Sequence, residues 1–455
     1  MDFKEVQDEY TKLRQDEESS TINRIKLLTS RRSAVFDLSN YFFFGKSSKF
    51  FLKSFRDYLN SKKPVESLVL QNCCITSKTL LEILKLLKKH QNPINFLDIS
   101  NNRLKIEPNH SEAISKFFAV TSKPKSLILK GNNCANPTTF KELYSKEIIL
   151  KELNLYDSGL SADALLVISR ILSVNRSIRK LNLGYNSEAF ENYVNVHTFG
   201  QSVGANSNII VLNLSDNTSL GKPEHLRQLC EGIKQNRSLN ILHLGGLDFE
   251  DEGAKILVSS LLQEMPLPGL DIQNNNIGDI GLTYILTNFP CTLTFLDVSY
   301  NTFTDNSSIL TLAQLLKQTK SLRKLSISHC FELESFNSNC ASIFCESITK
   351  NDSLAELLCE GIKIPGNPDD FCARLGEAIE IRKLSLTYKI SAINGREKKA
   401  CEDSESLLVQ SSIKVVSKMP SDVWDFKETE SGSLTEKKYY IDSPNQEPIK
   451  VVFFS

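Results

Sequence analysis

The sequence predicts an α/β solenoid, in which a strand and a helix alternate along the chain. A short motif, LxxLxLxxN/CxL, occurs twelve times between residues 65 and 381, at a mean step of about 29 residues. Each copy runs into an apolar stretch with helical spacing. No apolar run approaches the roughly 20 residues that a membrane span requires. These observations predict stacked repeats and no membrane span.

The copies differ in strength. The clear ones begin at Val65, Ile94, Leu150, Ile178, Ile209, Leu239, Leu267, Leu293 and Leu322. The weaker ones begin at Pro124, Leu354 and Ile381. Chance does not place LxxLxL this often at one period, so the repeat is the main organising feature of the chain.

Each part of the motif has a physical interpretation. The alternating L-x-L predicts a strand whose two leucines point to the same face. Leu80, Leu84 and Leu87 illustrate the helical spacing that follows. A single strand and helix cannot bury both apolar faces, but stacked copies can. We expect a parallel sheet on the concave face and helices on the convex face of a horseshoe, because helices are wider than strands.

The Asn/Cys position of the motif predicts a structural ladder. An amide at the end of a strand can donate to and accept from turn backbone that would otherwise be buried without partners. Cys73 and Cys330 occupy the same position as small, weakly polar substitutes. The asparagines expected to have this role are Asn102, Asn132, Asn186, Asn217, Asn275 and Asn301.

Composition excludes several function classes. The formal net charge is zero, which argues against nucleic acid or an anionic membrane surface as partner. The 11 cysteines are scattered without a CxxC pair, which predicts reduced thiols and no metal site. The charged N-terminus lacks the apolar core of an export signal. We expect no cofactor and no catalytic residue.

The repeats resemble the ribonuclease-inhibitor-like subfamily of leucine-rich repeats, over about residues 35–390. The step length and a D-x-G-A/L-x-x-L helix start carry the resemblance. This start occurs twice, at Gly253, Ala254 and Leu257 and at Gly281, Leu282 and Ile285. Members include ribonuclease inhibitor, cytosolic innate immune receptors, activators of the Ran GTPase, and effectors that intracellular bacteria secrete into host cells. The resemblance implies a leucine-rich-repeat solenoid that binds a protein partner without catalysis.

Departures from these members keep alternatives open. The chain has no GxxxxGK[ST] loop, which the nucleotide-binding domain of the immune receptors would need. It has a single tryptophan, and its tail lacks the dense acidic run of the Ran activators. Arg103 is the one arginine just after a strand, where a Ran-type activator would need a catalytic arginine, although a solvated surface role is more typical. A bacterial effector, a eukaryotic cytosolic adaptor and a GTPase-activating protein remain as hypotheses.

The pattern predicts three regions. Residues 1–64 would form a helical cap with a degenerate repeat, residues 65–390 the array of about twelve repeats, and residues 391–455 a non-repeat tail. Within the tail we expect strands near Ile413–Val416 and Ile449–Phe454, separated by a mobile polar segment at 425–438.

The tail sequence raises two functional hypotheses. Cys401 lies in a CxD sequence that resembles the nucleophile of bacterial ubiquitin ligases, but about 55 residues are too few for their catalytic domain. The polar end with hydrophobic residues near its terminus resembles a type IV secretion signal, and an edge strand explains it equally well. We expect a cytoplasmic monomer, or a protein secreted into a host cytosol without a cleavable signal peptide.

The candidate binding surface follows from strand geometry, because residues that flank the buried leucines face the concave side. Binding energy concentrates on aromatic and charged residues. We predict two clusters, one around Tyr156 and Tyr185 and one around His243, Asp271, Phe295, Asp297 and Tyr300. The predicted partner-binding residues are Phe96, Asp98, Tyr156, Tyr185, His243, Asp271, Phe295, Asp297 and Tyr300.

Overall fold

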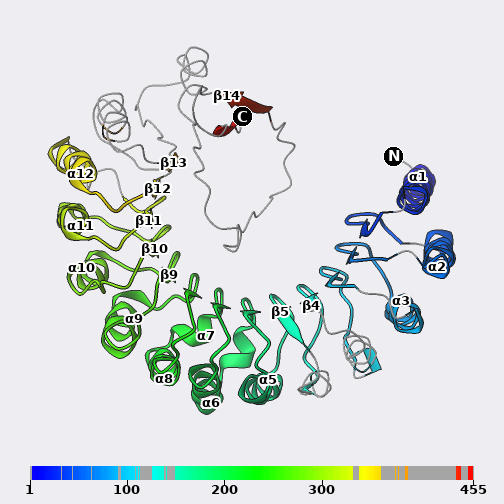
Figure 1. The fold of residues 1–455 in the computed structure, drawn as a ribbon, viewed down its shortest axis with the longest axis horizontal. Coiled ribbons are helices and arrows are strands. Elements are labelled where there is room, and N and C mark those ends of the chain that lie inside the picture. Colours follow the sequence, from blue (N-terminus) through cyan, green and yellow to red (C-terminus); the bar gives the residue numbers. More distant parts are fainter. Residues whose placement is uncertain are drawn as a thin grey trace. The chain divides into compact units, whose positions relative to one another are not determined.

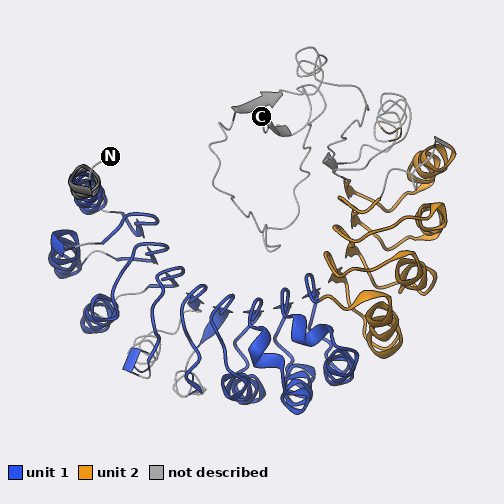
Figure 2. Cartoon of the chain, turned by 180° about the vertical axis from the view of Figure 1, so that it is seen from behind, with its two compact units in different colours: residues 1–247 blue, residues 248–455 orange. Residues whose placement is uncertain are grey.

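The computed structural model divides into two compact units, residues 1–247 and 248–455 (Figures 1 and 2), and each unit is described by itself. The described residues are 3–31, 33–43, 45–62, 64–90, 94–107, 109–110, 112, 125–137, 140, 149–331, 338–359, 375, 378, 385–387, 437–441 and 449–453.

The first unit is built on a parallel sheet in which each strand pairs with the next one along the chain. Its strands are β1 (Val35–Asp37), β2 (Ser67–Val69), β3 (Phe96–Asp98), β4 (Lys125–Ile128), β5 (Leu150–Asn154), β6 (Lys180–Asn182), β7 (Val211–Asn213) and β8 (Ile241–His243). Its described helices are α1 (Phe3–Ser30), α2 (Gly45–Asn60), α3 (Ser77–Lys89), α5 (Ala162–Val174), η2 (Ser187–Phe190), α6 (Tyr193–Gly204), α7 (Thr218–Gly221) and α8 (Pro223–Ile233). Within this unit the helices lie on one face of the sheet (Figure 1).

The second unit repeats the arrangement, and β9 to β13 again pair in parallel and in chain order. Its strands are β9 (Gly269–Asp271), β10 (Phe295–Asp297), β11 (Lys324–Ser326), β12 (Glu356–Leu358), β13 (Ser385–Thr387), β14 (Lys437–Ile441) and β15 (Ile449–Phe453). Its described helices are α9 (Glu250–Leu257), a π-helical turn η3 (Val258–Leu262), α10 (Asp279–Thr287), α11 (Asn306–Gln318) and α12 (Ser338–Lys350).

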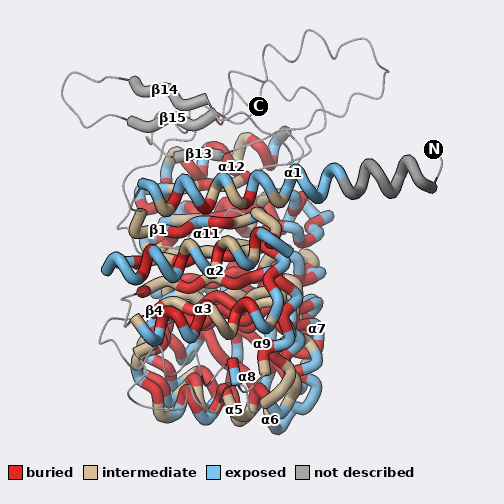
Figure 3. Tube along the Cα trace, turned by 90° about the vertical axis from the view of Figure 1, so that its right-hand side faces the viewer, coloured by how far each residue is buried: buried red, intermediate tan, exposed pale blue. Residues whose placement is uncertain are grey.

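The core of each unit lies between sheet and helices. The middle residue of each of the three-residue strands β1 to β3 and β6 to β12 is a buried apolar side chain, as Leu97, Leu212 and Leu296 illustrate. Buried and exposed positions alternate along the helices (Figure 3), as expected for amphipathic helices packed on one side. The predicted α/β solenoid of leucine-rich repeats is confirmed within each unit.

The segment before Val65 also contains a strand and a helix. Strand β1 pairs in register with β2, and α2 follows it. Aromatic side chains fill the space beneath them: the rings of Phe36 and Phe55 lie 5.4 Å apart and those of Phe43 and Phe51 lie 5.2 Å apart. Phe43 is buried. The boundary at residue 64 stays a prediction.

The C-terminal prediction is partly wrong. Strand β15 forms where a strand was expected near residues 449–454, but it pairs antiparallel with β14. Residues 437 and 438 of β14 fall in the segment that we predicted to be mobile. The polar residues at 425–438 concealed the strand propensity of Tyr439, Tyr440 and Ile441, which follow them. Residues 413–416, residues 425–436 and Cys401 lie outside the described residues.

The predicted asparagine ladder is confirmed at the strand exits. The amide nitrogen of Asn186 donates to the carbonyl oxygens of Leu155, Leu183 and Gly184 at 2.7–3.1 Å. Its Oδ1 accepts from the backbone N–H groups of Ser158 and Leu160. One side chain therefore closes its own turn and that of the preceding repeat.

Cysteine takes the ladder position as predicted. The thiol of Cys73 donates to the carbonyl oxygen of Leu38 at 2.9 Å, and Cys330 makes the equivalent bond to Val298. Burial raises the pKa of the Cys73 thiol to about 12. The thiol therefore stays protonated at neutral pH and serves as a structural donor.

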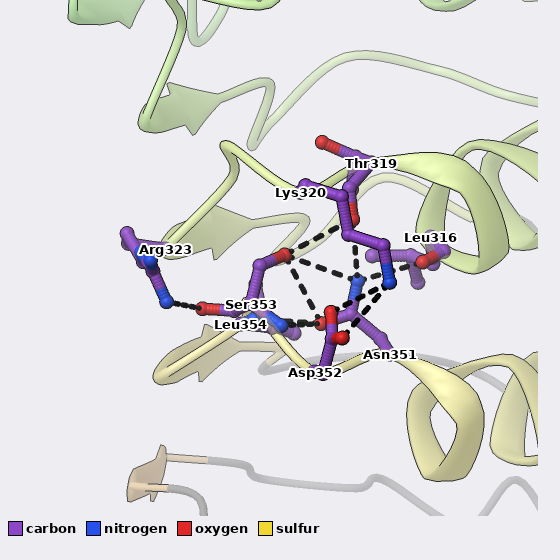
Figure 4. A network of polar contacts seen from close by, with 8 residues as sticks. All are labelled: Leu316, Thr319, Lys320, Arg323, Asn351, Asp352, Ser353 and Leu354. Carbon is purple, nitrogen blue, oxygen red and sulfur yellow. Dashed lines mark hydrogen bonds and ion pairs between the residues drawn. The ribbon is translucent and has the colours of Figure 1, made fainter.

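A second asparagine ladder, which the sequence analysis missed, precedes the strands. In the second unit, Asn351 donates to the carbonyl oxygen of Leu316 at 2.6 Å and accepts from the backbone N–H groups of Ser353 and Leu354 (Figure 4). Asn206 and Asn236 make equivalent bonds in the first unit. An N-x-S or N-x-N sequence a few residues before β7, β8 and β12 was the available signal.

Candidate functional site

The last residue of most strands forms a turn, which limits its availability to a partner. Asn154 shows the pattern, because its Oδ1 accepts from the backbone N–H of Tyr156, two residues on, at 3.0 Å. The same bond, at 2.8–3.1 Å, is accepted by Asp37, Asp98, Asn182, Asn213, Asp271 and Asp297. Three predicted binding residues, Asp98, Asp271 and Asp297, therefore have a structural role as well.

The third residue after each of the strands β1 to β11 adopts a left-handed backbone conformation. We call these eleven residues the left-handed row. Its members have φ between 49° and 68°. They are Asn40, Asn72, Asn101, Gly131, Asp157, Tyr185, Asp216 and Gly246 in the first unit, and Asn274, Tyr300 and His329 in the second. Asn, Asp and Gly tolerate this conformation well, whereas a bulky residue there costs roughly 1–2 kcal/mol.

Tyr185 and Tyr300 are bulky residues that adopt this unfavourable backbone conformation, so they are exceptions within the row. Tyr185 and Tyr300 have 58% and 54% of their surface exposed, so burial does not offset the cost. Strained residues persist where function requires them more often than elsewhere. This observation marks the left-handed row, next to the strand face, as the candidate binding surface.

The first unit contains a tyrosine cluster, which consists of Lys130, Tyr156, Tyr185 and Asp216. The rings of Tyr156 and Tyr185 stack at 6.0 Å between centroids. The Tyr156 hydroxyl donates to Oδ2 of Asp216 at 2.9 Å, and Lys130 Nζ lies 4.6 Å from the Tyr156 ring centre. The predicted proximity of Tyr156 and Tyr185 is present in the structure.

Gly184 makes this cluster possible. A Cβ at Gly184 would lie 2.7 Å from Cδ2 of Tyr156 and 3.0 Å from the carbonyl oxygen of Ser215. The Tyr156 ring therefore crosses the neighbouring repeat over a position without a side chain and reaches Asp216 one repeat further on. The sequence analysis did not identify Lys130, Gly184 or Asp216, because their role depends on contacts between repeats.

The second unit has two aromatic contacts, one within the left-handed row and one on strand β10. Tyr300 stacks on His329, with 4.9 Å between ring centroids and 14° between planes. Lys324 Nζ lies 5.5 Å from the ring centre of Phe295 and forms an ion pair with Glu356 at 3.2 Å. Phe295 is partly exposed, so its ring is accessible beside a paired lysine.

Asp271 and Asp297 occupy paired positions on β9 and β10. Burial, followed by the negative charge of Asp271, raises the pKa of Asp297 to about 6. Ser299 donates to Asp297 from its backbone N–H, and its hydroxyl lies 2.6 Å from that of Ser326. The Asp297 carboxyl therefore changes its charge around pH 6.

The remaining residues named from the sequence are Phe96, Asp98, His243 and Arg103. Phe96 and Asp98 lie on β3 and are half-buried, and burial raises the pKa of the Asp98 carboxyl. His243 ends β8 in the first unit, whereas the other residues predicted to cluster with it belong to the second unit. Arg103 is exposed in a left-handed turn after β3, with φ of 54°.

Among the described residues, no group of three or more His, Cys, Asp or Glu side chains could hold a metal ion. The nine cysteines in that part of the chain are free thiols, and seven of them are buried. No helix in the described ranges is long and apolar enough to cross a membrane.

Comparisons with known proteins agree with the repeat pattern. The family model described as Leucine Rich repeat matches residues 270–286 and 289–307. No curated protein matches the chain. Similar solved structures include a leucine-rich repeat-containing protein, LegL7, from Legionella pneumophila, with 16% identity, coverage of 70% of this chain and 89% of that chain, and a TM-score of 0.41.

Two further structures cover about a third of the chain. The tropomodulin C-terminal domain of Caenorhabditis elegans is 13% identical over 35% of this chain and 93% of that chain, with a TM-score of 0.29. Leiomodin-1 Actin-Binding Site 2 is 16% identical over 36% and 76%, with a TM-score of 0.22. TM-scores below 0.5 say nothing further about this chain. The matched segments and the recurring strand, turn and helix give the described residues the fold of leucine-rich repeats.

Proposed function

We propose that the chain is a non-enzymatic scaffold that binds a protein partner through its strand face and left-handed row. The exposed tyrosines at left-handed positions carry the proposal, since asparagine would satisfy the backbone at lower cost. Tyrosine is a frequent source of binding energy, because it offers a large rigid surface with a polar tip.

The test compares two tyrosines of similar exposure in the first unit, one in the left-handed row and one on helix α6. Tyr185 is 58% exposed in the left-handed row, and Tyr193 is 57% exposed on α6. Proteins captured from a host-cell lysate by the full chain are quantified by mass spectrometry for the unmodified chain, Tyr185→Asn, Tyr300→Asn and Tyr193→Asn. We expect a partner that Tyr193→Asn retains and that Tyr185→Asn or Tyr300→Asn loses at least tenfold. Capture of no partner, or equal capture by all variants, would contradict the proposal.

A finer proposal concerns the subclass of repeat. We infer that the repeats are ribonuclease-inhibitor-like, and the helix starts of the second unit support this. Oδ1 of Asp251 accepts from the backbone N–H groups of Gly278 and Gly281, each at 2.8 Å. Asp279 accepts from the backbone of Thr304 in the same way. The D-x-G sequence therefore links the start of one helix to the next.

We also propose that the chain acts in a host cytosol as a secreted bacterial effector. The family resemblance and the composition of the last residues support this proposal. A translocation reporter fused to the chain tests it in infected cells, with a donor strain that lacks type IV secretion as control. Signal that does not depend on the secretion system, or no signal from a stable fusion, would contradict it.

A further inference from the structure

The tyrosine cluster of the first unit has a charge pattern that points to one kind of ligand. The left-handed row places Asp157, Tyr185 and Asp216 on three successive repeats. Backbone bonds fix these neighbours: the N–H of Asp157 donates to Gly184, and the N–H of Tyr185 donates to Ser215. Parallel strands lie about 4.8 Å apart, so the tyrosine stands between two carboxylates at close range.

The exposed ring of Tyr185 can accept a cation. Asp157 is exposed on one side, and Asp216 is half-exposed on the other, where it accepts from the Tyr156 hydroxyl. The cluster already holds one cation over a ring, since Lys130 Nζ lies 4.6 Å from the centre of Tyr156. Two carboxylates disfavour a phosphate or an acidic side chain at the same place.

Resting on the proposed function, we infer that this cluster binds an arginine side chain of the protein partner. The guanidinium stacks on the exposed ring of Tyr185, and its N–H groups donate to the carboxylates of Asp157 and Asp216. Arginine fits better than lysine, because its planar group stacks on an aromatic ring and donates in two directions at once. The inference goes beyond a general binding scaffold by naming the chemistry that the partner presents.

The experiment uses small probes, so it does not depend on finding the partner. The full chain with ¹³C-labelled tyrosine rings is titrated with acetyl-arginine amide, and Tyr185→Phe assigns the Tyr185 signal in the NMR spectrum. We expect saturable shifts of Tyr185 with a dissociation constant on the order of 1–10 mM. Acetyl-citrulline amide, which has nearly the same shape without the charge, should bind at least fivefold more weakly.

Two variants connect the probe to the carboxylates. Asp157→Asn should weaken arginine binding about two- to fivefold, as expected for loss of an exposed charged partner. Asp163→Asn, which removes an exposed carboxylate at the start of α5, should leave it unchanged. Equal binding of arginine and citrulline, no response to Asp157→Asn, or equally tight binding of acetyl-lysine amide would overturn the inference.

The outcomes also separate this inference from the proposed function. If Tyr185→Asn loses a protein partner but arginine and citrulline bind alike, the scaffold proposal stands and the arginine assignment is wrong. If arginine binds at Tyr185 while Tyr185→Asn and Tyr300→Asn still capture every partner, the scaffold proposal is wrong, and the assignment to a protein partner fails with it.

Discussion

Tyr185 in the first unit and Tyr300 in the second occupy the same position of their repeats, but their surroundings differ. Tyr185 has an aspartate on either side in the left-handed row, whereas Tyr300 has Asn274 on one side and stacks on His329 on the other. The strand ends show the reverse distribution of charge. The strands next to Tyr185 end in Asn154, Asn182 and Asn213, whereas those next to Tyr300 end in Asp271 and Asp297.

The comparison separates what the fold requires from what recognition requires. Either an amide or a carboxylate can accept the turn bond at a strand end, so the fold leaves the charge there undetermined. In the first unit, exposed Asp157 and half-exposed Asp216 flank a tyrosine, whereas in the second unit Asp271 is buried and Asp297 is half-buried at the strand ends. The predictions that follow test whether the scaffold is equivalent in both units and whether the charged sites differ.

The largest effect is expected from the asparagine ladder. Asn186→Ala in the first unit and Asn301→Ala in the second should each lower the free energy of unfolding by about 3 kcal/mol or more, because several buried backbone groups lose their partners. Urea denaturation measures both changes. Asn301→Cys, which can keep one bond as Cys330 does, should cost less. Unequal losses in the two alanine variants would contradict an equivalent scaffold.

An intermediate effect is expected at Asp297. Its pKa is raised from 3.8 to about 6, so the folded state binds the proton more tightly than the unfolded state. The stability that the protonated form contributes is complete below pH 3.8 and is lost as the pH rises through about 6. Asp297→Asn should remove this dependence and raise the free energy of unfolding at pH 7 by about 1–2 kcal/mol, a figure discounted for partial exposure.

Denaturation at pH 5 and pH 7 checks this expectation. The matched change in the first unit is Asn213→Asp, which places a carboxylate at the equivalent strand end and should introduce a similar pH dependence. If Asp297→Asn leaves the free energy of unfolding at pH 7 unchanged, the prediction is wrong. Groups other than the serine partners would then compensate the charge of the Asp297 carboxylate.

The smallest effect is expected from the tyrosines themselves. Replacing Tyr185 by Asn relieves a left-handed strain of roughly 1–2 kcal/mol and loses a stack worth about 0.5–1.5 kcal/mol. The Tyr300 stack is closer, at 4.9 Å against 6.0 Å between centroids. Tyr185→Asn should therefore be at least as stable as the unmodified chain, and Tyr300→Asn slightly less stable than Tyr185→Asn. Replicate urea titrations resolve the order, and its reversal would remove the argument from strain.

Much of the fold could be predicted from the sequence, because buried leucines and ladder asparagines recur at fixed spacing and each has a local physical role. The second ladder was missed since Asn206, Asn236 and Asn351 lie outside the motif that was aligned. Strand β14 was missed for a different reason: polar residues precede and begin it, and they conceal the strand propensity of Tyr439, Tyr440 and Ile441.

Less of the candidate site could be predicted. Tyr156 and Tyr185 were expected to lie close together, because they follow neighbouring strands. The bond from Tyr156 to Asp216 could not be foreseen, since it requires a ring to cross Gly184 and reach a residue 60 positions away. The left-handed row was also hidden, because conformation at a turn is not visible in the identity of a tyrosine.

The asparagine ladder bears on how such a chain can change over evolutionary time. Each ladder residue bonds to its own turn and to that of the preceding repeat, so gain or loss of one whole repeat leaves every remaining asparagine with equivalent partners. Loss of part of a repeat would instead leave turns open. Duplication of a repeat can therefore lengthen the array without new kinds of hydrogen bond at the turns. Each added repeat also supplies another left-handed position that an aromatic residue can occupy.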